Sequence, residues 1–231
     1  MEQLYLTPYT LQSPSIKLNE TQDLVKLEMK TLELFCGTKS FSKIAKEYLC
    51  DTVTSDRDER FSPDIASDVF DLNFNRGQFD IIWASPPCEG FSVASIGHHW
   101  NKDHTPKTDV AAKSLDIVCK TIEIIKEVQP KYWFIENPRG KLRKVIDRYL
   151  QGLDYKRETI SYCRYGDTRM KPTDIWTNAF EWKPIDRMCA NGNPDHDSAP
   201  RGSKTGTQGL PDYEAKSIIP SELFIEIFTQ I

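Results

Sequence analysis

Residues 79–92 read Phe-Asp-Ile-Ile-Trp-Ala-Ser-Pro-Pro-Cys-Glu-Gly-Phe-Ser. The apolar run from Ile81 to Ala84 is bounded by turn-forming residues, which is typical of a strand buried on both faces of a parallel sheet. Proline cannot donate a hydrogen bond to a neighbouring strand, so the Pro-Pro pair must end this one. Cys88 is therefore predicted just beyond the C-terminal end of a central strand, where ligands bind in open α/β sheets.

A cysteine on a proline-stiffened loop is well placed to act as a nucleophile if its thiolate is favoured. A lone cysteine is more often a buried structural residue, but the preceding strand and prolines favour the catalytic interpretation. The segment Ser-Pro-Pro-Cys-Glu-Gly-Phe-Ser resembles the catalytic loop of the DNA cytosine-C5 methyltransferases. The resemblance implies that Cys88 adds to C6 of a cytosine and that Pro86 borders the S-adenosylmethionine site.

The composition is that of an ordinary globular protein. The chain has 231 residues, a net charge of −4, 28% charged and 39% hydrophobic residues, enough for one core with a small appendage. A nucleic-acid role therefore requires a local basic cleft. Six scattered cysteines, with no apolar signal segment or membrane-spanning run, predict reduced thiols and no membrane contact. We expect a monomer in the cytoplasm of a bacterium or a phage-infected cell.

Residues 31–48 predict a strand, a tight turn and a helix, the opening of a Rossmann-like unit. Gly37 lies in the turn, and Ser40 is the predicted N-cap of the helix. Taken alone, a turn with one glycine is equally compatible with a simple strand–helix connection. The methyltransferases have a Phe-x-Gly-x-x-Ser turn that cradles the methionine part of S-adenosylmethionine. The resemblance assigns this role to Phe35, Gly37 and Ser40, while Lys39 departs from the pattern.

Acidic residues after the next strands complete the predicted cofactor site. The strand predicted at 51–56 ends at Asp56, about twenty residues after the turn, where a ribose-binding carboxylate is expected. A solvated strand-end aspartate is the alternative. The resemblance implies that Asp68 receives the adenine amino group and that Val69 packs on the ring, with Asp64 and Asp71 as competitors.

Residues 131–135 predict another buried strand, which ends at Glu136 and is followed by Asn137 and Pro138. The parallel with the Pro-Pro-Cys element places the carboxyl and the sulfur at one cleft. A carboxyl partly removed from water can hold a proton, and the alternative is an acid that caps a helix beginning at Gly140. The Glu-Asn-Pro match implies that Glu136 hydrogen-bonds N3 and the exocyclic amine of cytosine, which makes C6 electrophilic.

Two helical segments and a histidine-rich loop surround this strand. Residues 109–128 form a strong amphipathic pattern, with Val110 among the apolar positions and Pro130 ending the helix. The histidines at 98, 99 and 104 predict a mobile polar loop, because adjacent histidines do not easily share one metal ion. The basic run at 140–150 predicts a helix with a solvated face.

Strands predicted at 155–162 and 174–178 flank a hairpin with three cations, which suits contact with a base edge and phosphates. The methyltransferases usually carry Gln-x-Arg-x-Arg here. The resemblance aligns Arg169, Lys171 and Thr173 with these three positions. It implies that Arg169 or Lys171 holds the cytosine carbonyl oxygen and leaves open which of the two does so.

The last part of the chain changes in composition. Residues 183–213 are rich in Pro, Gly, Asn, Asp and Ser and predict a loop region, in the position of the family's target-recognition domain. A flexible linker is the alternative. Cys163, Cys189 and His196 lack a fourth zinc ligand, so no metal site is predicted. Before a closing helix, the resemblance places Ser217 and Ile219 at the cofactor pocket.

Together these patterns predict an α/β, Rossmann-like S-adenosylmethionine-dependent methyltransferase with a mixed, mostly parallel sheet flanked by helices and a very small target-recognition insertion. The predicted parts are an extension (1–28) with a short helix near 21–27 and an alternative start at Met29, a catalytic core (29–182), a recognition region (183–213) and a closing helix (214–231). The implied function is methylation of flipped-out cytosine in DNA, as in restriction-modification. An RNA (tRNA) cytosine methyltransferase, a catalytically silent binding module and a histidine-based metalloprotein are the alternatives.

Overall fold

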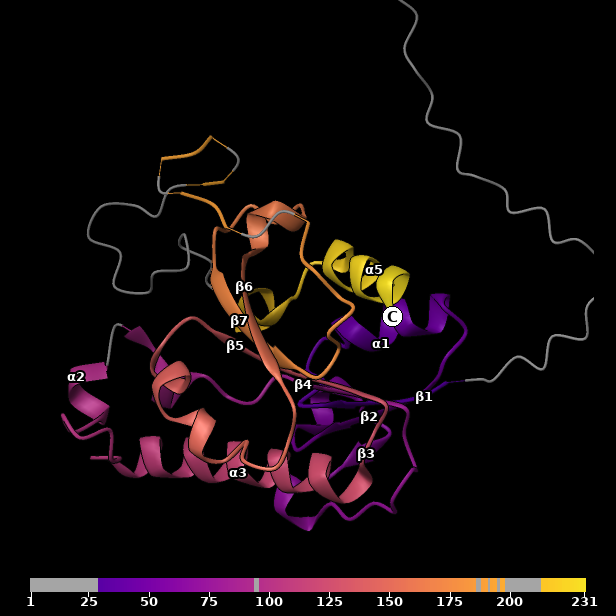
Figure 1. Ribbon diagram of the computed structural model, residues 1–231, viewed down its shortest axis with the longest axis horizontal. Coiled ribbons are helices and arrows are strands. Elements are labelled where there is room, and N and C mark those ends of the chain that lie inside the picture. The colour runs from indigo at the N-terminus through magenta and orange to yellow at the C-terminus, as the bar shows by residue number, and fades with distance from the viewer. Residues whose placement is uncertain (1–28, 94–95, 186–187, 191, 195, 198–212) are drawn as a thin grey trace, which may run out of the picture.

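The computed structural model describes residues 29–93, 96–185, 188–190, 192–194, 196–197 and 213–231. They contain one seven-stranded sheet in the order β3-β2-β1-β4-β5-β7-β6, in which β7 runs antiparallel to both of its neighbours (Figure 1). The predicted mixed, mostly parallel sheet is confirmed. The strands are β1 (Lys30–Leu34), β2 (Asp51–Asp56), β3 (Ile65–Ala66), β4 (Ile81–Ala84), β5 (Tyr132–Pro138), β6 (Lys156–Ser161) and β7 (Pro172–Thr177).

Helices cover both faces of this sheet. The long α3 (Asp109–Val128) lies on one face, and α1 (Ser40–Glu47) and α5 (Ser221–Gln230) lie on the other (Figure 1). The shorter α2 (Ile96–His99) and α4 (Tyr213–Ser217) complete the α-helices of the described residues. Single 3₁₀ turns connect the elements: η1 (Glu59–Phe61), η2 (Val69–Asp71), η3 (Glu89–Phe91), η5 (Lys141–Lys144), η6 (Ile146–Arg148) and η7 (Tyr162–Tyr165).

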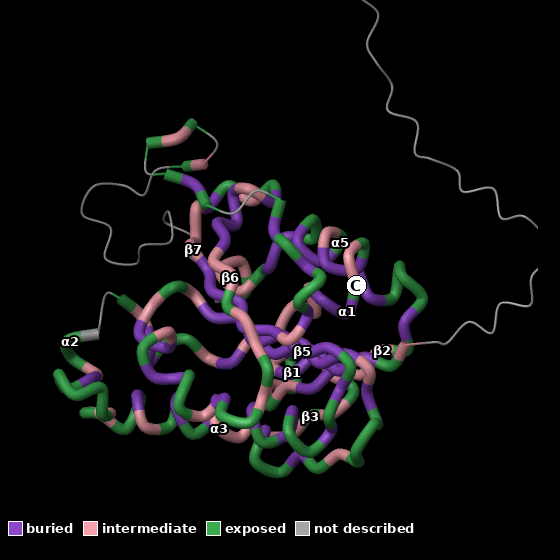
Figure 2. Tube along the Cα trace, in the orientation of Figure 1, coloured by how far each residue is buried: buried purple, intermediate pink, exposed green. Residues whose placement is uncertain are grey.

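Strand β4 is buried on both faces, as its apolar run predicts. Side chains alternate across a strand, so Ile82 and Ala84 join the core beneath α3, whereas Ile81 and Trp83 join the core beneath α1 and α5. All four residues have no exposed surface, and Figure 2 shows buried segments gathered in the centre of the sheet. The central position of β4 is what carries the Pro-Pro-Cys segment to the middle of the sheet edge.

Helix α3 has the bounds that its periodicity predicts. The Thr108 hydroxyl accepts a hydrogen bond from the Ala111 N–H at its start, and Gln129 adopts a left-handed conformation (φ 52°) at its end. The assignment of Val110 to the apolar face is wrong, because that side chain is 44% exposed. The packed face instead includes Ala111 and Ser114.

The start of α1 differs from the prediction. Lys39, in a left-handed conformation, occupies the N-cap position, and Ser40 is the first helical residue. The first-turn N–H groups of Phe41 and Ser42 are bound instead by the buried carboxylate of Glu33 on β1, at 3.1 and 2.9 Å. A strand side chain thus replaces the local cap, because the tight turn places β1 directly beneath the helix start.

Two expectations for the second half of the sheet are also corrected. Strand β5 continues through Glu136 to Pro138, because β7 pairs with it antiparallel and supplies partners beyond the end of β4. The basic run at 140–150 forms two 3₁₀ turns and not a helix with a solvated face. Lys141 is buried, and Arg143 makes an ion pair with the fully buried Asp174.

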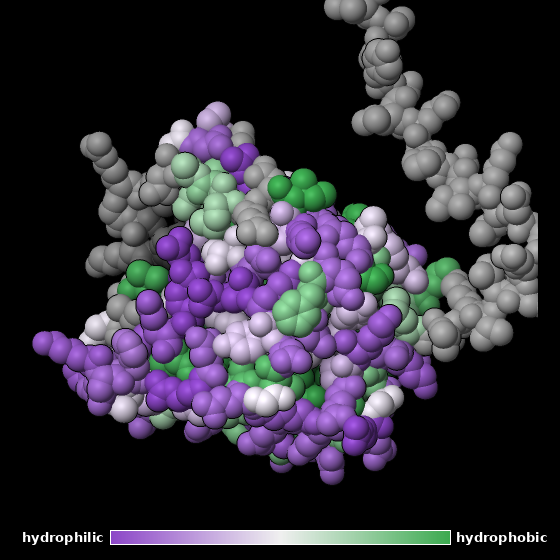
Figure 3. All heavy atoms as spheres, in the orientation of Figure 1, coloured by the Kyte–Doolittle hydropathy of each residue, from purple (hydrophilic) through white to green (hydrophobic). Residues whose placement is uncertain are grey.

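Hydrophilic residues dominate the face of the molecule in Figure 3, and apolar residues are confined to small patches there. No helix in the described part of the chain combines the length and apolar character needed to cross a membrane. The helix predicted near 21–27 lies outside the described residues.

Candidate active site

Cys88 follows the end of β4, and Glu136 lies near the end of the neighbouring parallel strand β5. Ala84 at the end of β4 pairs with Ile135 on β5, so Glu136 stands one position beyond the point at which β4 turns away. Cys88 follows after the two prolines and begins η3, where its carbonyl accepts the Phe91 N–H at 3.0 Å. Cys88 is exposed, whereas Glu136 is buried at 4% exposure. The carboxyl is therefore shielded from solvent, whereas the sulfur-bearing residue is accessible.

The loop that carries Cys88 is held by the elements beside it. The side-chain amide of Asn137 donates to the carbonyl of Pro86 at 2.9 Å, and the indole of Trp100 donates to the carbonyl of Gly90 at 2.6 Å. A Cβ added at Gly140 would lie 2.2 Å from the carbonyl oxygen of Phe91. The Glu-Asn-Pro and Pro-Pro-Cys motifs are thus joined directly, and the loop is anchored on both sides of Cys88.

Tyr162 is a site residue that the sequence analysis missed. Its hydroxyl donates to Oε1 of Glu136 at 2.7 Å, and its side chain is fully buried. Burial and the Glu136 carboxylate raise the pKa of Tyr162 well above its usual value, so the hydroxyl keeps the proton that it donates. The bond occupies Oε1 of Glu136. The two residues are 26 positions apart, so no local pattern could have linked them.

The two candidate cations of the hairpin have different surroundings. The guanidinium of Arg169 makes an ion pair with Asp167 and donates to the carbonyls of Ala215, Lys216 and Ile218 at 3.0, 2.9 and 2.9 Å. Its five N–H groups are thereby used within the protein. Arg169 joins the hairpin to the segment before α5, and its geometry suits positioning better than contact with a base.

Lys171 keeps more of its bonding capacity. Its ammonium lies 4.6 Å from the centre of the Tyr162 ring and donates to the Lys216 carbonyl at 3.3 Å. The backbone of Lys171 has a φ of 25°, a conformation that side-chain-bearing residues rarely adopt and that is often found at functional sites. Of the two cations left open by the sequence, Lys171 is the one whose ammonium lies over the Tyr162 ring, with the Lys216 carbonyl as its single acceptor among the described residues.

The thiol of Cys88 responds to this charged environment. Burial by neighbouring atoms raises the pKa of Cys88, and the Glu136 carboxylate also raises it, whereas the positive charge of Lys171 lowers it. The protonated thiol is therefore favoured in the unliganded protein, although the residue is reachable from solvent. A nucleophilic thiolate at Cys88 therefore requires that the surroundings of the sulfur change when substrate binds.

Three of the predicted cofactor residues come together beside this site. The N–H of Gly37 donates to Oδ2 of Asp56 at 3.0 Å, and the Asp58 N–H donates to Oδ1 at 2.9 Å. A Cβ added at Gly37 would lie 3.9 Å from the hydroxyl of Ser217. Each oxygen of Asp56 keeps a lone pair. The carboxylate can therefore accept hydrogen bonds from ribose hydroxyls such as those of S-adenosylmethionine.

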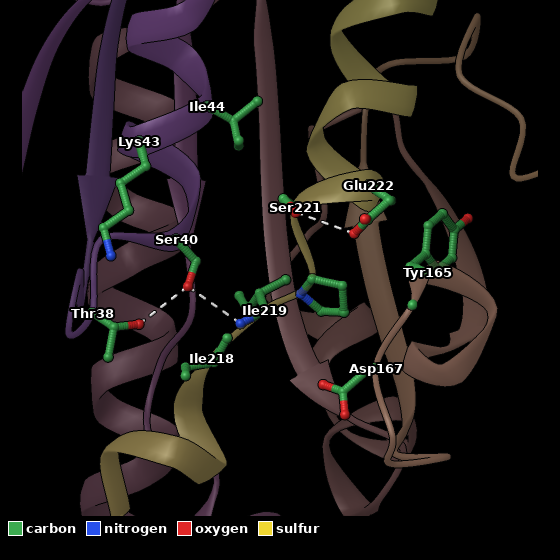
Figure 4. A pocket seen from close by; sticks show the side chains of 12 residues that line it. Thr38, Ser40, Lys43, Ile44, Tyr165, Asp167, Ile218, Ile219, Ser221 and Glu222 are labelled. Atoms are coloured by element: carbon green, nitrogen blue, oxygen red, sulfur yellow. Dashed lines mark hydrogen bonds between the residues drawn. The ribbon is translucent and has the colours of Figure 1, made fainter. Parts of the chain in front are cut away.

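A hollow of about 530 Å³ lies between α1, η7 and the start of α5. Figure 4 shows the Ser40 hydroxyl between the hydroxyl of Thr38 and the backbone N–H of Ile219, at 3.1 and 3.2 Å. Ser40 and Ile219 therefore meet, as their shared assignment implies. Asp56 and Pro86 do not line this hollow, so it overlaps the predicted cofactor site only at its edge.

The remaining predicted cofactor residues lie along the same sheet edge in different settings. Asp68 caps η2 by accepting the Phe70 N–H at 3.3 Å, and Val69 is buried in the core beneath α3. Phe35, with a φ of 58°, is partly buried against that core. The competitor Asp64 binds the backbone and hydroxyl of Thr54, which gives it a structural partner already.

Comparison with known proteins adds an independent finding. The sequence model described as "C-5 cytosine-specific DNA methylase" matches residues 42–162, just over half of the chain. A protein of Frog virus 3 (isolate Goorha), described as "Probable DNA (cytosine-5)-methyltransferase", is 30% identical over 170 residues, which cover 70% of this chain and 75% of that protein.

Solved structures similar to this chain include two methyltransferases. S. pombe Dnmt2 has a TM-score of 0.46 and 12% identity, covering 64% of this chain and 50% of its own. Entamoeba histolytica EhMeth has a TM-score of 0.49 and 15% identity, covering 70% of this chain and 56% of its own. This chain therefore spans about half the length of these solved proteins.

Proposed function

Because this chain belongs to the C-5 cytosine-specific DNA methylase family, we propose that it transfers a methyl group from S-adenosylmethionine to C5 of cytosine in DNA. The observation that carries the proposal is the pairing of an exposed Cys88 with a buried Glu136 at the ends of adjacent parallel strands. A nucleophile and an acid at one sheet edge are the two groups that activation of a pyrimidine ring requires.

Cys88 is the proposed nucleophile. Its sulfur adds to C6 of the cytosine, and the electron pair of the C5–C6 double bond moves toward N3 and enriches C5. C5 takes the methyl group, and the electron pair of the donor's sulfur–methyl bond stays on the donor sulfur. A base then removes the C5 proton, its electron pair re-forms the C5–C6 double bond, and the Cys88 thiolate leaves C6. C6 is reached from the face of the ring, so the base must leave the helical stack before Cys88 can attack it.

Glu136 is the proposed partner of N3. Tyr162 binds Oε1 and thereby directs Oε2 toward the substrate, where the carboxyl can donate a proton to N3. A proton placed on N3 withdraws electron density from C6 and makes the addition of sulfur easier. In this arrangement Tyr162 is a positioning residue, because it acts through Glu136 and does not touch the base.

Lys171 is the proposed ligand of the cytosine carbonyl oxygen. Its ammonium retains donors that Arg169 has committed to Asp167 and to the segment before α5. The same positive charge lowers the pKa of Cys88 and so favours the thiolate that attacks C6. Lys171 can therefore assist both the nucleophile and the electrophile.

S-adenosylmethionine supplies an electrophilic methyl carbon when it is bound. Asp56 would accept its ribose hydroxyls, and Gly37, Ser40, Ser217 and Ile219 would surround its methionine part. Phe35, Asp68, Val69 and Pro86 would form the remaining contacts along the same edge of the sheet. Apart from Ser217 and Ile219, which precede α5, these residues lie at or follow the C-terminal ends of parallel strands, where such cofactors bind.

The proposal also divides the chain by role. Residues 29–182 form the catalytic core, 183–213 the recognition region, and 214–231 the helix that completes the core, preceded by the extension 1–28. The protein would act as a monomer in the cytoplasm of a bacterial or phage-infected cell. Its net charge of −4 means that DNA must be held by local cations such as Lys171 and those of the recognition region.

Covalent trapping tests this function without knowledge of the target sequence. DNA made with 5-fluorocytosine in place of cytosine offers every sequence context, and a C5 fluorine cannot leave as a proton. We expect the wild-type protein to form a denaturant-resistant adduct with this DNA that requires S-adenosylmethionine, and peptide mapping to locate it at Cys88.

Two variants and one competing acceptor complete the test. Cys88→Ser should form no adduct while still binding S-adenosylmethionine, and Cys119→Ser on α3 should behave as wild type. Labelled methyl groups offered with DNA and RNA together should appear in DNA, and bisulfite sequencing then identifies the methylated motif. The assignment would be overturned if the wild-type protein formed no adduct, or formed one at a residue other than Cys88. Transfer of methyl groups to RNA alone would show that the acceptor is RNA and not DNA.

A further inference from the structure

The structure brings together three side chains of metal-ligating types from two separate parts of the sequence. Cys163 lies on η7, whereas Cys189 and His196 lie on the segment that follows β7. One ligand atom from each residue lies within 4.8 Å of the other two, and both cysteines are buried. It is the one such cluster of three or more ligands among the described residues. Neither Cys88 nor Glu136 belongs to it, so the proposed reaction leaves it unexplained.

The spacing of the atoms agrees with tetrahedral zinc. Bonds of about 2.3 Å to sulfur and about 2.0–2.1 Å to nitrogen place a sulfur and a nitrogen about 3.5 Å apart at the tetrahedral angle. The observed distance from Sγ of Cys189 to Nδ1 of His196 is 3.4 Å. The set of two thiolates and one imidazole is also the set that zinc prefers over magnesium or calcium.

The backbone around the cluster is fixed independently of a metal. The N–H of Cys189 donates to the Ser161 hydroxyl at 3.0 Å, and the N–H of Asp197 donates to the Thr168 carbonyl at 2.9 Å. These bonds tie the segment to the beginning and the end of η7, on either side of Cys163. The three ligands are therefore held by two anchored stretches of chain and do not meet through one flexible loop.

The segment after Trp182 has little apolar packing of its own. Ile185 is 84% exposed and Met188 is 38% exposed, so the large apolar side chains here add little to the core. Short segments without a core are commonly stabilised by a structural metal. A metal at this cluster would replace the missing packing at the point where the chain enters the proposed recognition region.

We propose that Cys163, Cys189 and His196 bind one Zn²⁺ ion, which joins the start of the 183–213 region to the η7 hairpin. The two thiols lose their protons on binding, so the two thiolates balance the charge of the ion. His196 contributes a neutral imidazole through Nδ1, and water completes the tetrahedron. The earlier expectation of no metal site depended on a missing fourth protein ligand, which this arrangement does not require.

The position of the ion gives it a defined structural role. Cys163 directly follows Tyr162, whose hydroxyl holds Glu136, and η7 leads into the turn that carries Arg169 and Lys171. The ion would therefore connect the proposed recognition region with the proposed catalytic groups. This consequence rests on the proposed function, but metal binding itself can be measured without any methyl transfer.

Metal content and cobalt substitution test the proposal on the full chain. We expect one zinc per chain by mass spectrometry of protein purified without chelators. Protein stripped of metal should bind one Co²⁺ with the visible absorption of a tetrahedral site and a thiolate-to-cobalt charge-transfer band. Added Zn²⁺ should abolish both signals.

Matched variants identify the ligands. Cys189→Ser should lose the charge-transfer intensity of one thiolate and bind Co²⁺ at least tenfold more weakly, and His196→Ala should weaken binding while retaining both thiolate contributions. Cys119→Ser and His98→Ala should bind as wild type. The cobalt titration of the wild-type protein remains decisive even if a ligand variant does not fold. Absence of zinc together with no thiolate–cobalt band, or a Cys163–Cys189 disulfide in peptides mapped without reductant, would overturn the proposal.

Discussion

At the scale of single residues, the chemistry depends on how fixed charges act on the sulfur of Cys88. Burial and Glu136 favour the protonated thiol, and Lys171 opposes them. The attacking species is the thiolate, so the rate should rise with pH until the thiol has ionised. The cation therefore determines how much active thiolate is present near neutral pH.

Replacing Lys171 with methionine should shift this pH dependence. Without the positive charge the pKa of Cys88 rises, so the ascending limb of kcat/KM against pH should move to higher pH. The measurement is kcat/KM for methyl transfer to DNA from about pH 6 to about pH 10. This range is wide enough to include both limbs of the pH profile. Lys102→Met, at an exposed position, is the control. An unchanged profile in Lys171→Met would show that the cation does not act on the sulfur.

The sequence could identify Cys88 and Glu136 but could not rank Arg169 against Lys171. Both residues are cations in one hairpin, and their separation from the base cannot be read from their order in the chain. The ranking depends on the segment before α5, whose carbonyls bind the Arg169 guanidinium and withdraw it from the substrate. Those carbonyls lie more than forty residues away along the chain.

At the scale of elements, α1 begins over a buried acid. Burial raises the pKa of Glu33 to about 7, although hydrogen bonds from Ser42 and Phe41 lower it in part. Its ordinary value is 4.5, so the unfolded chain ionises at lower pH than the folded protein. The stability that protonated Glu33 contributes is therefore fully present below pH 4.5 and is lost as the pH rises through 7.

Glu33→Gln should flatten this pH dependence. The wild-type protein should lose roughly 2–3 kcal/mol of unfolding free energy between about pH 5 and pH 8 because of this residue alone. Glu33→Gln keeps an oxygen for the helix N–H groups and cannot ionise, so its stability should vary less over that range. Urea denaturation at both pH values measures the difference. Glu47→Gln, an exposed acid on the same helix, should retain the wild-type slope, and an equal slope in Glu33→Gln would contradict the prediction.

The contact between η3 and η5 sets the position of the catalytic loop. A methyl group at Gly140 would approach the carbonyl oxygen of Phe91 to 2.2 Å, far inside any permitted contact. Gly140→Ala should therefore displace the loop that carries Cys88 and lower kcat about 10- to 100-fold. The KM for S-adenosylmethionine should change less than kcat, because the proposed cofactor residues other than Pro86 lie on other loops.

Gly97→Ala provides the matched control for this substitution. A Cβ at Gly97 meets no atom within 4 Å, although Gly97 lies on the same connection after Cys88. Methyl-transfer kinetics and a thermal unfolding curve should be measured for both variants. Wild-type kcat in a folded Gly140→Ala protein would show that the contact does not control the loop.

At the scale of the whole molecule, the last helix closes a core that begins near the other end of the described chain. Phe224 on α5 contacts Phe41 on α1 and Trp83 on β4, with ring centres 5.6 and 4.8 Å apart. It is fully buried, whereas its neighbour Ile225 is 41% exposed. The core beneath α1 and α5 therefore forms only when distant parts of the chain meet.

Phe224→Ala should destabilise the protein by about 3–5 kcal/mol, because it removes a buried ring and leaves a cavity. Ile225→Ala should cost less than about 1 kcal/mol, since that side chain is partly in water. Urea denaturation at one pH measures both values. Similar losses for the two variants would mean that α5 is not packed as described.

The sequence by itself determined six of the seven strands, although not the short β3 or the full length of β5, together with the long α3 and the two motifs at the sheet edge. Side-chain alternation, helical periodicity and the missing N–H of proline all act over a few neighbouring residues, so they are visible in the order of amino acids. The tertiary structure alone decided the Glu33 cap of α1, the Tyr162–Glu136 bond and the meeting of Cys163, Cys189 and His196. The last two join residues whose distance depends on the order of strands in the sheet and on the antiparallel insertion of β7, whereas the Glu33 cap depends on how the turn after β1 brings α1 over that strand. Hydrogen bonds, charge interactions and metal coordination depend on the distances between atoms. Those distances are set only once the sheet has assembled.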